Sequence, residues 1–125
     1  MKAPQILYIE DNRDNFTLVK RVLEVEGYEV IEAPTGRNGL QKAGELLPDL
    51  IITDINLPDI DGYDITLRLK ENPKTAHIPV VAMTANVMKK DRDFVQKAGC
   101  QGFIAKPIDI DALPLQIENF LRGDL

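Results

Sequence analysis

Short apolar runs alternate along the chain with longer segments whose apolar residues recur at the spacing of one helix face. This alternation is typical of β-α units, which assemble into a parallel sheet covered by helices. The runs predict five strands, at residues 5–10, 28–32, 50–53, 80–83 and 103–105. The periodic segments predict five helices: one capped by Asp14 and ending before Gly27, one at 36–46, one after Gly62 that contains Ile65 and Leu69, one at 86–98 and one at 110–121. We therefore expect an α/β fold with a doubly wound, five-stranded parallel sheet.

Three of the predicted strands end abruptly in charged residues. The first runs into Glu10 and Asp11, the third into Asp54, and the fifth into Lys106. The fourth ends at a hydroxyl residue, Thr84. Functional groups in an open α/β sheet gather just beyond the carboxyl ends of the parallel strands. We therefore expect these five side chains to surround one pocket.

Three neighbouring carboxylates repel one another, so such a pocket favours a bound cation. Oxygen ligands suit Mg²⁺ or Mn²⁺, and Mg²⁺ usually keeps several waters beside one or two carboxylates. An aspartate next to that metal can attack phosphorus and carry the group as an acyl phosphate. Lys106 and the Thr84 hydroxyl would then contact the other phosphoryl oxygens. The strand ends thus predict phosphoryl transfer to an aspartate.

Composition narrows the class of protein. A length of 125 residues with 44% apolar content fits one globular domain, and a net charge of −5 argues against a nucleic-acid partner. The one cysteine, Cys100, can form no internal disulfide, which favours a reducing compartment. The sequence shows no secretion signal and no apolar run of membrane-spanning length. We expect one cytoplasmic domain over residues 1–125, with no output domain and no membrane contact.

The motifs at the strand ends also resemble a known family. They are Ile9-Glu10-Asp11-Asn12, Asp54-Ile55-Asn56-Leu57-Pro58 with Asp61-Gly62, residues 80–85, and Lys106-Pro107. In this order and spacing they resemble a response-regulator receiver domain, most closely the stand-alone receivers of the DivK type, over essentially the whole chain. The resemblance implies a flavodoxin-like sheet with strand order 2-1-3-4-5. It also implies a two-component or phosphorelay role, with a histidine kinase or histidine phosphotransfer protein as phosphodonor and a downstream protein as target.

The resemblance assigns a role to each residue of the pocket. Asp54 is implied to be the phosphoacceptor. Asp11, Asp54 and the backbone carbonyl of Asn56 would hold Mg²⁺, and Glu10 would act through a water. Lys106 is implied to bind the phosphoryl group, and the Lys106-Pro107 peptide is expected to be cis.

Further positions match those through which the family switches. Thr84 and Phe103 would be the switch hydroxyl and the switch aromatic, which change position after phosphorylation and remodel a protein-binding surface. Asn56 and Asn86 lie where the family tunes the lifetime of the phosphoryl group. Such a protein catalyses its own phosphorylation and dephosphorylation but turns over no separate substrate. It would be a monomer or a phosphorylation-dependent dimer.

Two residues depart from the family pattern. Pro114 lies about one turn into the last predicted helix, where proline removes a backbone donor and tends to kink or delay a helix. Tyr8 stands in the first strand where a smaller aliphatic residue is more usual, and its hydroxyl needs a partner if it is buried.

Three other functions remain as alternatives. A phosphohydrolase with an aspartyl-phosphate intermediate needs an acidic residue two positions after the nucleophile, where this chain has Asn56. A nucleotide or flavin site offers glycines, hydroxyls and a helix N-terminus to phosphate, whereas Glu10 and Asp11 would repel it. A phosphate-independent interaction module with the same fold is the third alternative, and the complete set of site residues argues against it.

Overall fold

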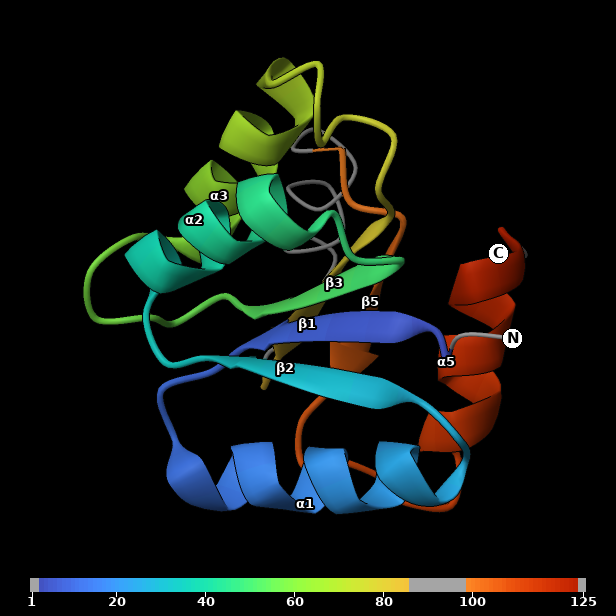
Figure 1. The fold of residues 1–125 in the computed structure, drawn as a ribbon. Helices are drawn as coiled ribbons and strands as arrows, with labels where there is room; N and C mark the ends of the chain where they lie inside the picture. The colour runs from blue at the N-terminus through green and yellow to red at the C-terminus, as the bar shows by residue number, and fades with distance from the viewer. Residues whose placement is uncertain (1–2, 86–98, 124–125) are drawn as a thin grey trace.

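The sheet has five parallel strands in the order β2-β1-β3-β4-β5, which confirms the predicted doubly wound architecture (Figure 1). This computed structural model describes residues 3–85 and 99–123. The strands are β1 (Gln5–Ile9), β2 (Glu29–Ala33), β3 (Leu50–Asp54), β4 (Val80–Thr84) and β5 (Gly102–Ala105). Each lies within about one residue of its predicted position. The boundaries of β3 and β4 are the easiest to predict, because every residue of these strands is buried and a strand buried on both faces has a nearly continuous apolar sequence.

Four helices cover the sheet within the described residues. They are α1 (Arg13–Val25), α2 (Gly36–Leu46), α3 (Gly62–Glu71) and α5 (Leu113–Arg122). Figure 1 shows α1 and α5 on one face of the sheet and α2 and α3 on the other. The predicted helix at 86–98 lies outside the described residues. None of the described helices combines the length and the apolar character that crossing a membrane requires.

Alternate residues of the central strand β1 face opposite sides of the sheet. Ile6 and Tyr8 belong to the apolar core beneath α1 and α5, whereas Leu7 and Ile9 belong to the core beneath α2 and α3. All four side chains are fully buried. This period of two follows from the pleat of a strand. The two cores hold β1 and β3 rigidly, and the candidate site residues follow these strands directly.

The first helix begins differently from the prediction. Asn12, rather than Asp14, is its N-cap, and the Asn12 side chain accepts a hydrogen bond from the backbone N–H of Asn15 at 3.0 Å. Asp14 lies in the first turn, where a negative charge suits the positive end of the helix dipole. The chain thus turns from β1 into α1 within three residues, which places Glu10 and Asp11 in a short, constrained connection.

The last helix begins at Leu113, three residues later than predicted. Pro114 therefore lies in its first turn, where the backbone nitrogen has no partner within the helix. Asp109 organises the preceding turn by accepting hydrogen bonds from the backbone N–H groups of Asp111 and Ala112, at 3.0 and 3.3 Å. Of the two expected effects of Pro114, a kink or a delayed start, the structure shows the delayed start. The helix loses no internal hydrogen bond, because a first-turn nitrogen has no partner within the helix.

The loop between β3 and α3 is closed at its base and fastened to a neighbouring helix. The backbone N–H of Gly62 donates to the carbonyl of Ile55 at 3.0 Å. The Asp59 carboxylate accepts hydrogen bonds from the backbone N–H groups of Gly36 and Arg37, at 2.9 and 3.0 Å, and so binds the first turn of α2. These bonds fix the segment that follows Asp54.

Candidate functional site

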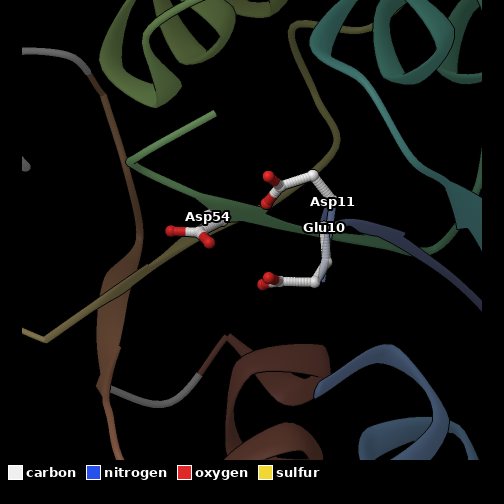
Figure 2. A group of neighbouring side chains, drawn as sticks. All are labelled: Glu10, Asp11 and Asp54. Carbon is white, nitrogen blue, oxygen red and sulfur yellow. The ribbon is translucent and has the colours of Figure 1, made fainter. Parts of the chain in front are cut away.

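Three carboxylates meet at the carboxyl ends of the two central strands. Glu10, Asp11 and Asp54 each place one oxygen within 4.8 Å of the other two, and Figure 2 shows the three groups turned toward a common space. The register pairs Ile9 of β1 with Thr53 of β3, so the residues that follow are neighbours. Glu10 is 2% exposed and Asp54 is 4% exposed, whereas Asp11 is exposed to solvent. The structure thus brings together the acidic residues singled out in the sequence.

Lys106 contributes a positive charge to the same cluster. Its Nζ lies 2.7 Å from Asp54 Oδ2 and 3.2 Å from Glu10 Oε2. The backbone N–H of Lys106 donates to the carbonyl of Thr84 at 2.8 Å, which holds the end of β5 against the end of β4. The Lys106-Pro107 peptide bond is cis, which confirms the expectation from the sequence.

The charges in this cluster do not balance. Burial, followed by the negative charge of Asp54, raises the pKa of Glu10, and Lys106 only partly opposes this shift. Burial disfavours the charged form of Lys106, but the hydrogen bond and charge of Asp54, with those of Glu10, outweigh it and raise the pKa of Lys106. The cluster holds three carboxylates and one ammonium, which contacts two of them, so its formal charge is −2 when all the carboxylates are ionised. Hard oxygen donors with this excess charge fit a divalent cation such as Mg²⁺.

We expect the stability of the Glu10→Gln variant, without divalent cations, to depend less on pH than that of the native protein. A glutamate whose pKa is raised by folding binds protons more tightly in the folded state, so its contribution lowers stability as pH rises from the unfolded to the folded pKa. Gln does not titrate, but its single amide oxygen cannot replace both acceptor oxygens of Glu10, so the variant also loses a hydrogen bond at every pH. Urea unfolding should therefore show a smaller loss of stability in the variant than in the native protein as pH rises over this range. The same loss in both proteins would contradict the repulsion described here.

Thr84 and Phe103 occupy neighbouring strands beside this cluster. Thr84 is the last residue of β4, is 4% exposed and pairs in register with Ala105 of β5. Phe103 lies half-buried in β5 and packs against a small apolar cluster that contains Ile55 and Ala82. Thr84 therefore ends β4 beside the end of β5, which Lys106 follows, and Phe103 lies two residues before that end.

Two asparagines are expected to tune the lifetime of the phosphoryl group, and the structure describes one of them. The backbone N–H of Asn56 donates to Asp54 Oδ1 at 3.1 Å, and its side chain is exposed just beyond the end of β3. Asn86 lies outside the described residues.

Two contacts on Glu10 go beyond the sequence-based expectation. The hydroxyl of the buried Tyr8 donates to Glu10 Oε2 at 3.1 Å, and the backbone N–H of Asn12 donates to Glu10 Oε1 at 3.3 Å. The sequence does carry a signal for the first contact, since a buried Tyr8 needs a partner and residues two apart on a strand share a face of the sheet. The resemblance to receiver domains assigns Glu10 to the metal alone, and so gives Tyr8 no partner.

Comparison with known proteins identifies the family. Residues 6–118 match the response regulator receiver domain. The chain is 39% identical over 119 residues to the polar-differentiation response regulator DivK of Brucella ovis, covering 95% of this chain and 96% of that protein. The same identity is found with DivK of Brucella suis.

Solved structures agree with the sequence relatives. A putative response regulator from Chloroflexus aurantiacus has a TM-score of 0.91 and 31% identity, with 97% of this chain and 99% of that chain covered. The receiver domain of the sensor histidine kinase PA1611 from Pseudomonas aeruginosa, solved with a magnesium ion coordinated in its active-site cleft, has a TM-score of 0.88 and 29% identity, with 96% and 98% covered. The strand order, the acidic strand ends and these relatives lead to one conclusion: the chain belongs to the response regulator receiver domains of two-component signalling.

Proposed function

We propose that Asp54 is the phosphoacceptor of this receiver domain. One oxygen of its carboxylate would attack the phosphorus of a phosphohistidine, and the bond from phosphorus to the imidazole nitrogen would break. The observation that carries the proposal is the position of Asp54. Its buried carboxylate has an oxygen within 4.8 Å of oxygens of Glu10 and Asp11 and accepts a 2.7 Å hydrogen bond from Lys106.

The metal of this reaction would be held by the acidic cluster. Receiver domains bind Mg²⁺ at an acidic site, and here Asp11, Asp54 and the backbone carbonyl of Asn56 are the proposed ligands, with Glu10 acting through a water. The fit rests on the oxygen donors within 4.8 Å of one another and on their unbalanced charge. Bound Mg²⁺, or Mn²⁺ in its place, would supply positive charge to the phosphoryl oxygens. Lys106 would transfer its ammonium hydrogen bond from Asp54 to a phosphoryl oxygen.

The output of the domain would come from the neighbouring strands. We propose that the Thr84 side chain moves toward the phosphoryl group and that its hydroxyl donates a hydrogen bond to a phosphoryl oxygen. Phe103 would then move into the space that Thr84 leaves, which would change a protein-binding surface. Asn56 and Asn86 would set how long the phosphoryl group survives. Both Thr84 and Phe103 adjoin the strand end that carries Lys106, which supports this coupling.

Receiver domains generally interact with histidine kinases and downstream targets and do not turn over a separate substrate. For this chain we propose a histidine kinase or histidine phosphotransfer protein as phosphodonor, a protein target, no nucleic-acid partner, and a monomer or phosphorylation-dependent dimer. The free thiol of Cys100 supports a reducing, cytoplasmic setting.

The direct test is intact-mass analysis after incubation with a small acyl-phosphate donor. With Mg²⁺ we expect a gain of one phosphoryl group, and with a metal chelator we expect none. Borohydride reduction of the acyl phosphate, followed by peptide mapping, should locate the group on Asp54. No gain with the small donor or with a phosphorylated phosphotransfer domain would instead favour a phosphate-independent interaction module.

A further inference from the structure

The hydroxyl of Tyr8 reaches the acidic cluster from inside the core. Tyr8 is fully buried in β1, and its ring stacks on Phe16 of α1 with 5.9 Å between ring centroids and 23° between planes. The hydroxyl lies 3.1 Å from Glu10 Oε2 and 3.1 Å from the sulfur of Met83. The stacking contact requires only an aromatic ring, so it leaves the presence of a hydroxyl unexplained.

Of its two neighbours, the carboxylate is the one to which the hydroxyl donates. A phenol has a single proton, and an ionised carboxylate is a much stronger acceptor than a thioether. An ordinary phenol is protonated at neutral pH, so the Tyr8 hydroxyl acts as the donor in this contact.

Glu10 is held from three parts of the fold. Oε2 accepts from the Tyr8 hydroxyl and from Lys106 Nζ, and Oε1 accepts from the backbone N–H of Asn12. A carboxylate offers about four acceptor positions, and these three donors occupy three of them. The carboxylate is turned toward the space that it shares with Asp11 and Asp54 (Figure 2).

We propose that Tyr8 is a positioning residue, whose hydroxyl fixes the Glu10 carboxylate so that its remaining acceptor position serves the metal site. The inference rests on the proposed function, since it assumes that Glu10 takes part in holding Mg²⁺ through a water. Without the hydroxyl, Lys106 and Asn12 would still bind Glu10, but the carboxylate would be held by two contacts in place of three and could shift. Outer-sphere hydrogen bonds of this kind commonly decide how tightly ligands hold a metal.

The experiment compares Tyr8→Phe with Tyr28→Phe. Both changes remove one phenolic hydroxyl, and Tyr28 packs against the same core but precedes β2, at the opposite end of the sheet from the site. Mg²⁺ affinity is measured by calorimetry on samples shown to be folded by their urea unfolding curves. We expect Tyr8→Phe to weaken Mg²⁺ binding about tenfold and Tyr28→Phe to leave it unchanged.

A second readout separates positioning from general structural damage. In Tyr8→Phe, the Mg²⁺ concentration that gives half the maximal rate of phosphorylation by an acyl phosphate should rise by the same factor. The maximal rate at saturating Mg²⁺ should stay close to that of the native protein. If Tyr8→Phe binds Mg²⁺ as tightly as the native protein does, the proposed role of Tyr8 is wrong, whereas the proposed metal site is unaffected. Failure of the native protein itself to bind Mg²⁺ would overturn the proposed metal site.

Discussion

Replacing Asp54 by asparagine is expected to abolish phosphorylation by both an acyl-phosphate donor and a phosphorylated phosphotransfer protein. The amide has nearly the same shape as the carboxylate, but it cannot form an acyl phosphate. It also removes one of the three carboxylates of the acidic cluster, and the neutral amide is a weaker acceptor for the 2.7 Å bond from Lys106. Intact-mass analysis with Mg²⁺ should therefore show one added phosphoryl group in the native protein and none in the variant.

Asp49 offers a matched control at the opposite end of the same strand. It precedes β3, is exposed, and accepts a hydrogen bond from the backbone N–H of Gln5 at 2.7 Å, which an asparagine side chain can also accept. Asp49→Asn should be phosphorylated like the native protein. Full labelling of Asp54→Asn would refute the assignment of Asp54. Loss of labelling in Asp49→Asn as well would show that the effect of Asp54→Asn is not specific to that position, and the assignment would lose its support.

The sequence was sufficient to predict which residues meet at the site. Strands buried on both faces appear as apolar runs, and the first polar residue after each run marks its carboxyl end. Because parallel strands end at the same edge, Glu10, Asp54 and Lys106 could be placed together without knowing the order of the strands. That order itself came from the family resemblance, since hydrophobic periodicity carries no information on which strands are neighbours.

The pairing of individual atoms could not be read from the sequence. Lys106 bonds both Asp54 and Glu10 because only β4 lies between β5 and β3. Tyr8 bonds Glu10 because both turn to the face covered by α1 and α5. These contacts depend on strand order and on side-chain rotamers. As a result, Glu10 contacts both the buried core residue Tyr8 and the site residue Lys106.

Helix ends were the least predictable part of the fold. Asn12 and Asp14 are both good capping residues, and which one caps α1 depends on how soon the chain leaves β1. Ile110 fits the apolar period of the last helix, yet the turn built on Asp109 and the position of Pro114 make Leu113 the first helical residue. At the N-terminal ends of α1 and α5, local capping geometry therefore decided the first helical residue more than hydrophobic periodicity did.

Adding one methyl group at Gly62 is expected to destabilise the protein by about 3 kcal/mol, at the upper end of what overpacking usually costs. A Cβ at this position would lie 2.5 Å from the carbonyl oxygen of Asp54 and 2.6 Å from the Cα of Ile55. Both are backbone atoms, so no side-chain rotation relieves the contact. The Gly62→Ala variant must therefore move the end of β3 or break the bond from Gly62 to Ile55.

Gly44 provides the control, because it lies in the exposed part of α2, where an added Cβ would meet nothing within 4 Å. Gly44→Ala should stabilise the protein by about 0.5–1 kcal/mol, the usual gain from alanine in a helix interior. Urea unfolding of both variants measures the contrast, and equal stability of Gly62→Ala and the native protein would contradict the close approach. Since the displaced backbone carries Asp54, Gly62→Ala should also bind Mg²⁺ more weakly than Gly44→Ala, which links the packing of this loop to the chemistry of the site.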